Sequence, residues 1–99
     1  MGTDEDADFM EELKREFKDT IAKNIVEFHA LYKEAKFSDI ARIAHDIKGT
    51  AAVFELKKGS EIAAELQRSA QDEEVEKTKS LIEELIAYME ASGIVEKKQ

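Results

Sequence analysis

The segment Ala44-His45-Asp46-Ile47-Lys48-Gly49 holds residue types that could carry a covalent group. An imidazole ordinarily has a pKa near 6.5, so at neutral pH a histidine ring is mostly uncharged and nucleophilic. Such a ring is well suited to attack phosphorus. Lys48 lies three residues after His45, and at an exposed site its ammonium would stabilise a phosphate by about 0.3–1 kcal/mol. We therefore expect His45 to accept a phosphoryl group and Lys48 to support it.

The helical spacing around His45 predicts that its ring faces solvent. At about 100° per residue, His45 lies about 160–200° from Ile43 and Ile47 on the apolar face. The residues expected to share its face are small or cationic: Ala41, Arg42, Lys48, Gly49 and Ala52. Glycine inside a helix costs about 1 kcal/mol relative to alanine. At Gly49 it would let another molecule approach the ring closely. We expect Ala41, Arg42 and Ala52 to form a docking face.

Other catalytic groups are missing from the sequence. It has no cysteine, no glycine-rich phosphate loop and no carboxylate cluster spaced to hold Mg²⁺. Asp46 is rotated about 100° from His45, so we do not expect it to act as a dyad with the ring. His29 is expected to be a partly buried structural residue beside Phe28. The phosphoryl donor and the catalytic machinery should therefore come from a partner, and this chain should not itself be an enzyme.

The positioning elements are predicted from apolar residues that recur every three or four positions. Residues 6–35 form one long helix, or two helices joined by a kink near Asp19-Thr20. Ser38 or Asp39 caps a second helix, which ends near Lys57-Lys58-Gly59. A third helix restarts at Ser60 and a fourth ends at Ser92-Gly93. This pattern predicts an all-α, antiparallel four-helix bundle with up-down-up-down topology.

Composition limits the class of protein. The chain has 99 residues, of which 42% are hydrophobic and 38% charged, and it has no proline. We expect a single helical domain over 1–99, with frayed ends at 1–5 and 95–99. The net charge of −8 argues against nucleic-acid binding. The acidic start does not resemble a signal peptide and no apolar run could span a membrane. We expect a cytoplasmic monomer.

The segment Ala-His-Asp-Ile-Lys-Gly-Thr-Ala resembles the AH-x-[LI]-KG-[ST]-[AS] signature of histidine-containing phosphotransfer (HPt) domains. Five further positions outside this segment match the family pattern: Phe17, Phe37, Ile40, Ala63 and Leu66. The resemblance implies that His45 accepts the phosphoryl group through Nε2. It also implies that the partner is the receiver domain of a response regulator or hybrid histidine kinase. No cofactor is implied for this chain, and Mg²⁺ is expected only on the receiver.

The sequence departs from the HPt pattern at two positions. Glu55 stands where the family usually has glycine, and Gly59 stands where it usually has leucine. These departures affect the expected end of the helix that carries His45, not the phosphoacceptor segment itself. In some members a polar side chain of the following helix contacts the ring or the phosphate, which makes Gln67 a candidate.

Two alternative functions remain open from the sequence. The chain could be an HPt-fold interaction module that binds a receiver or a kinase without phosphotransfer. It could also be the detached phosphoacceptor domain of a histidine kinase, with an ATP-binding domain as donor. A module without transfer has no reason to keep histidine, lysine and glycine in this arrangement, so we favour the phosphorelay carrier.

Overall fold

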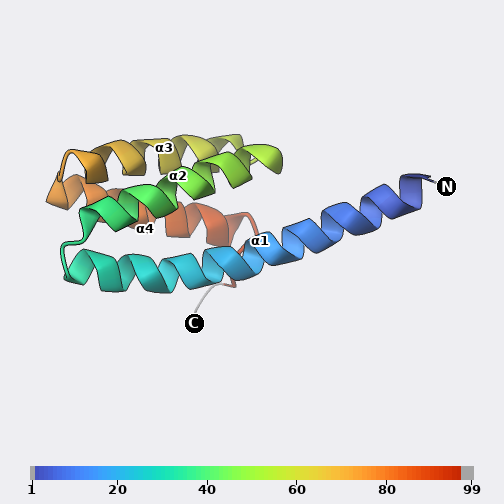
Figure 1. Cartoon of the computed structure of the whole chain (residues 1–99), viewed down its shortest axis with the longest axis horizontal. Helices are drawn as coiled ribbons and strands as arrows, with labels where there is room; N and C mark the ends of the chain where they lie inside the picture. The colour runs from blue at the N-terminus through green and yellow to red at the C-terminus, as the bar shows by residue number, and fades with distance from the viewer. Residues whose placement is uncertain (1, 97–99) are drawn as a thin grey trace.

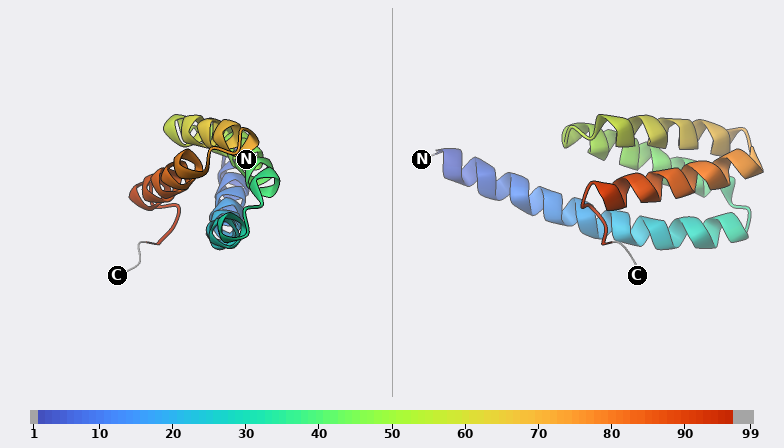
Figure 2. Two further views of the ribbon diagram at one scale, coloured as in Figure 1. Left: turned by 90° about the vertical axis from the view of Figure 1, so that its left-hand side faces the viewer. Right: turned by 180° about the vertical axis from the view of Figure 1, so that it is seen from behind.

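The computed structural model describes residues 2–96 of the chain and the side chains of residues 8–96. It forms four helices, α1 (Gly2–Lys33), α2 (Phe37–Val53), α3 (Lys57–Gln71) and α4 (Val75–Ala91). Successive helices run in opposite directions, and the end-on view shows them arranged around a shared centre (Figures 1 and 2). The predicted antiparallel four-helix bundle is therefore confirmed.

The first helix is longer than the bundle. α1 continues without a kink from Gly2 to Lys33, which decides between the two predicted arrangements of this region. Its N-terminal part projects beyond the other three helices (Figure 1). The predicted fraying of the two ends stays a prediction, and Met1 and residues 97–99 lie outside the described part of the chain.

The core is formed by apolar side chains from all four helices. α2 packs against both α1 and α3, and α4 closes the bundle against α3 and α1. The largest fully buried apolar side chains are Ile21, Phe28, Ile40, Leu66 and Met89. α2 is therefore covered on two flanks, by α1 and by α3.

All three connections between helices have the same three-residue geometry. The middle residue takes a left-handed conformation, at Ala35 (φ 57°), Glu55 (φ 59°) and Glu73 (φ 53°). The next residue donates its backbone N–H to the carbonyl five residues earlier. These bonds are Lys36 to Leu31, Leu56 to Ala51 and Glu74 to Ser69, each 2.9 Å long. This is the Schellman arrangement, which satisfies the free carbonyls at a helix end and reverses the chain.

These turns correct the predicted bounds of the second helix. Neither Ser38 nor Asp39 caps it, because the helix starts at Phe37 with Lys36 at the N-cap and no side-chain cap bond. The helix ends at Val53 rather than near Lys57, because Glu55 adopts the left-handed conformation. Lys57, Gly59 and Ser60 belong to the first turn of α3 instead.

The remaining helix ends agree better with the sequence. Gly93 has a φ of 75° and follows α4, as predicted for a glycine at a helix end. None of the four helices in the described part of the chain has both the length and the apolar composition that crossing a bilayer requires.

Candidate functional site

His45 projects from α2, whose opposite face is anchored in the core. Its neighbours Ala44 and Ile47 are 0% and 3% exposed, whereas His45 itself is exposed. The buried pair fixes the rotation of α2 about its axis, so the ring stays on the outer surface. Within the described residues, no side chain forms a hydrogen bond or an ion pair with the ring. Its nitrogens are therefore open to an approaching molecule.

Two grooves of about 530 Å³ each meet at His45. One lies between α1 and α2, and the other lies between α2 and α3. His45 lines both, so it stands on the ridge that separates them. A partner that reaches the ring must cover at least one of these grooves.

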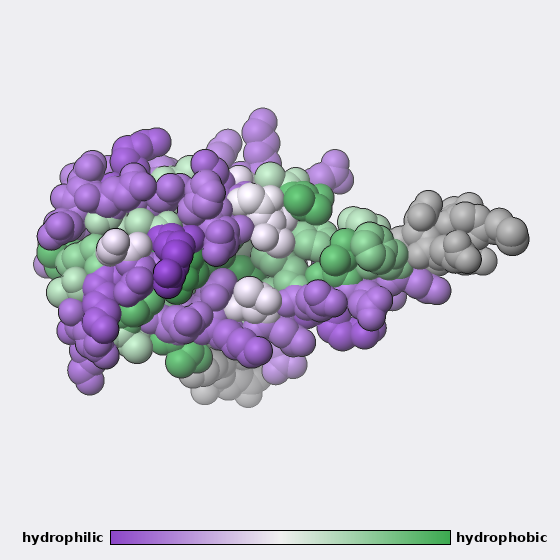
Figure 3. All heavy atoms as spheres, viewed as in Figure 1, coloured by the Kyte–Doolittle hydropathy of each residue, from purple (hydrophilic) through white to green (hydrophobic). Residues whose placement is uncertain are grey.

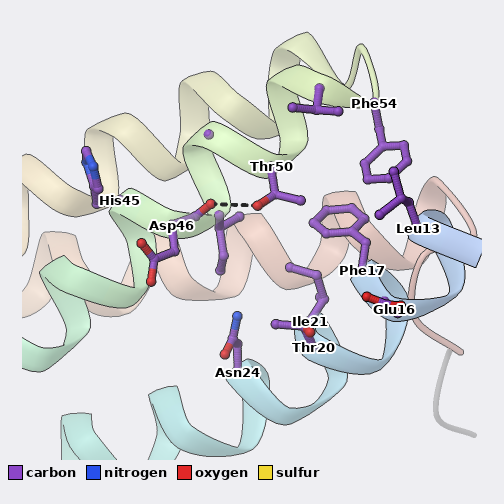
Figure 4. Close-up of a pocket in the computed structure, with 13 residues that line it drawn as sticks. Leu13, Glu16, Phe17, Thr20, Ile21, Asn24, His45, Asp46, Thr50 and Phe54 are labelled. Atoms are coloured by element: carbon purple, nitrogen blue, oxygen red, sulfur yellow. Dashed lines mark hydrogen bonds between the residues drawn. The ribbon is translucent and has the colours of Figure 1, made fainter. Parts of the chain in front are cut away.

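The groove between α1 and α2 has an apolar floor. Phe17 and Ile21 of α1 line it together with Ile47 of α2 and Phe54, the C-cap of α2. In Figure 4, His45 lies at one end of the groove, and the Phe17 and Phe54 rings lie at the other. The two rings stack with centroids 5.1 Å apart, which joins the first helix to the end of the second. The groove can therefore receive an apolar surface beside the nucleophile.

The groove between α2 and α3 is more polar. It brings Arg42 and Gln67 to the same groove as His45, and the role of Gln67 stays a prediction. Arg42 is exposed and its guanidinium pairs with the Asp39 carboxylate at 3.4 Å. Ala41 lines this groove but is only 6% exposed. The prediction that Ala41 shares the exposed face is therefore wrong, because α3 covers that flank of α2.

The other residues predicted on the His45 face lie near the surface. Gly49 and Ala52 are exposed and Lys48 is half-buried. A Cβ built on Gly49 would meet no other atom within 4 Å. Packing inside this chain therefore does not require glycine there, and the free space lies outside the protein. In the described part of the chain, the Lys48 ammonium pairs with no carboxylate.

Two hydroxyl groups fix the backbone of the turn after His45. Thr50 Oγ1 donates a hydrogen bond to the Asp46 carbonyl at 3.0 Å (Figure 4). Ser60 Oγ of α3 donates to the Lys48 carbonyl at 2.9 Å. Ser60 thus links α3 to the segment that carries His45, Lys48 and Gly49. The sequence prediction gave Ser60 the different role of starting a helix.

The contribution of α1 to the site was missed by the sequence reasoning. Leu13, Glu16, Thr20 and Asn24 line the groove that leads to His45, together with the aromatic pair. Their spacing of three or four residues is visible in the sequence, but it only shows that they share one face of a helix. The groove they form with α2 depends on how the two helices pack.

His29 and Asp46 are two further titratable residues for which the sequence makes a prediction. His29 is exposed, so the prediction of a partly buried structural histidine is wrong. Asp46 lines the groove between α1 and α2 and forms no side-chain bond with His45 in the described structure. Among the described residues, no three His, Cys, Asp or Glu side chains are grouped to hold a metal ion. The absence of a cofactor remains a prediction.

The model of one protein family, the Hpt domain, matches residues 12–93. The chain belongs to the Hpt domain family. The match covers α2 and α3 completely, so it includes His45, both grooves and the turn at Glu55. No curated protein and no solved structure gave a match.

Hpt domains carry phosphoryl groups in two-component signalling and interact with receiver domains and histidine kinases. They act as carriers and not as catalysts. The exposed histidine and the grooves beside it agree with that general role. The match begins at Glu12, so it leaves out the first turns of α1.

Proposed function

We propose that this Hpt domain is a phosphorelay carrier that exchanges a phosphoryl group between His45 and the aspartyl phosphate of a receiver domain. The observation that supports this most is that the exposed His45 ring lies one helical turn before the open space at Gly49. The ring is exposed, has no partner within the described residues, and is followed one turn later by a glycine that meets nothing. That arrangement suits the approach of a second active site.

The transfer needs no water and no metal held by this chain. Nε2 of a neutral His45 ring attacks phosphorus, and the N–P bond forms while the P–O bond to the receiver carboxyl breaks. The carboxylate leaves with the electron pair, and Nδ1 keeps its proton. Lys48, three residues after His45 on the same helix, supplies an ammonium that supports the new phosphate. The receiver supplies Mg²⁺ and the in-line geometry.

The test is incubation of the full chain with purified receiver domains that have been phosphorylated on aspartate. We expect an acid-labile, base-stable phosphate on the wild-type chain. His45→Gln should carry none, whereas the matched control His29→Gln should be labelled like the wild type, because both histidines are exposed. Label that persists in His45→Gln would show that the phosphoacceptor is another residue. Receiver binding without any label would favour the interaction module.

A further inference from the structure

An apolar stripe continues along α1 past the end of the bundle. Phe9 and Met10 precede Leu13 by four and three residues, and Leu13 precedes Phe17 by four, so all four lie on one face of the helix. Their burial increases along the chain. Phe9 is 60% exposed, Met10 44%, Leu13 is half-buried and Phe17 is 4% exposed. The stripe therefore begins in the core and ends in solvent.

The exposed end of the stripe is continuous with the groove that leads to His45. Leu13 and Phe17 line this groove, and so does Val53 at the end of α2, which is 61% exposed. Figure 3 shows apolar side chains gathered where α1 leaves the bundle. Contiguous exposed apolar residues with a polar border are typical of protein interaction sites, unlike scattered single residues. Asp8, Glu11 and Glu12 provide that border here.

We propose that residues 8–12, here named the overhang, form a second contact surface for the receiver domain that reaches His45. We infer that this partner presents an apolar strip bordered by lysine or arginine. The inference rests on the proposed function, since it concerns the same partner. Phe9 and Met10 precede the residues matched by the family model.

The distances allow one domain to touch both places. A helix rises 1.5 Å per residue, so the stripe from Phe17 to Phe9 spans about 12 Å, and α2 from His45 to Val53 also spans about 12 Å. A domain of 100–150 residues has a radius of gyration of about 13–15 Å. A receiver placed with its active site on His45 and its body over the α1–α2 groove therefore reaches the overhang.

Charge disfavours a second copy of this chain as the occupant of the overhang. The overhang has three carboxylates and no cation, and the whole chain has a net charge of −8. Two copies that paired through their overhangs would bring six carboxylates together, which opposes association. A partner with cations around its apolar strip gains affinity from the same charges.

The experiment compares receiver binding by three full-length variants. The probe is the receiver domain that binds most tightly in a purified panel from the source organism, with its affinity measured by calorimetry. In Phe9→Ser/Met10→Ser the apolar contact is removed, and in Glu11→Lys/Glu12→Lys the charge is reversed. The control is Val26→Ser, because Val26 is 69% exposed on α1 and lines neither groove at His45.

We expect the apolar double variant to bind about tenfold more weakly, because two buried apolar side chains are lost. The charge variant should bind more weakly at low salt and approach the wild type at high salt. Val26→Ser should bind like the wild type. The maximal transfer rate at saturating receiver should not change, since the overhang does not touch the reacting atoms.

The failures of the two proposals can be told apart because receiver binding and phosphate transfer are measured separately. If the overhang variants bind as tightly as the wild type, the overhang proposal is wrong. If the wild type sediments as a dimer and Phe9→Ser/Met10→Ser as a monomer, the occupant is a second copy and the proposal is also wrong. Overhang-dependent binding without phosphate transfer would overturn the carrier function alone. A chain that binds no receiver overturns both.

Discussion

The rings of Phe17 and Phe54 stack with an interplanar angle of 23° and centroids 5.1 Å apart. Phe17 belongs to α1, and Phe54 is the C-cap residue that follows α2. The pair joins the two helices at the far end of the groove from His45. It therefore holds the walls of the candidate docking groove at a fixed separation.

Replacing Phe54 by alanine should lower the free energy of unfolding by about 1–3 kcal/mol, because the stack and part of the buried area are lost. Phe54→Leu should lower it less, since leucine keeps much of the apolar contact. Urea unfolding followed by circular dichroism measures both values. Equal stability of the wild type and Phe54→Ala would show that the stack contributes nothing to the bundle.

Gly49→Ala should separate stability from phosphotransfer. The added Cβ meets nothing within 4 Å, so the helix should become more stable by up to about 1 kcal/mol. Transfer from a phosphorylated receiver should slow by roughly tenfold or more, because the methyl group stands where the partner must approach His45. Rapid-quench kinetics measures this rate. A more stable variant with an unchanged rate would remove the proposed reason for this glycine.

Lys48→Ala should reduce the transfer rate to His45 by about twofold to fivefold, which corresponds to the 0.3–1 kcal/mol of an exposed charge pair. Lys36→Ala is the matched control, because it removes an exposed cation that already pairs with Glu34 and lines neither groove at His45. Both rates come from the same time course with one receiver. If Lys36→Ala slows transfer as much as Lys48→Ala, the effect comes from net charge and Lys48 does not support the phosphate.

Glu55→Gly should raise the stability by about 0.5–1 kcal/mol. A left-handed conformation costs a side-chain-bearing residue about 1–2 kcal/mol, and glycine avoids most of this cost while losing some entropy on folding. Glu65→Gly is the matched control, since Glu65 is exposed inside α3. This variant should lower the free energy of unfolding by about 0.5–1 kcal/mol, because glycine is unfavourable inside a helix. Thermal melts of both variants test the opposite signs. A loss of stability in Glu55→Gly would mean that its side chain contributes more than the strain costs.

Gly59→Ala should destabilise the bundle by about 1–2 kcal/mol. A Cβ at this position would lie 2.7 Å from Cε2 of Tyr88, so α4 or the ring would have to move. In the Tyr88→Ala background the same substitution should be neutral or stabilising, because alanine is the better helix former. A double-mutant cycle from denaturant melts measures the coupling. No coupling would mean that the ring moves away without cost.

The sequence predicted the helices and the exposure of His45 because both depend on local periodicity. Ile43, Ile47 and the residues around them repeat at helical spacing, and a residue opposite that stripe must face outward. The same reasoning was wrong for Ala41. A single apolar stripe implies one buried direction, but α2 is covered by both α1 and α3, so its buried arc is wider than the stripe.

The end of the second helix could not be predicted for a different reason. Lys57-Lys58-Gly59 has the composition of a helix end, whereas Glu55 is an unusual residue for a left-handed turn. Glu55 nevertheless takes the left-handed conformation that ends the helix, at the cost of strain for a residue with a side chain. Gly59 in turn is required by the close approach of Tyr88, which depends on the packing of α3 against α4.

The position of His45 on the ridge between two grooves has a kinetic consequence for a carrier. A single nucleophilic nitrogen at the meeting point of both grooves can face only one active site at a time. Donor and acceptor must therefore visit in turn, and the loaded chain must dissociate before it can discharge. A partner that dissociates unusually slowly would therefore hold the carrier out of the relay and act as an inhibitor of the pathway it feeds.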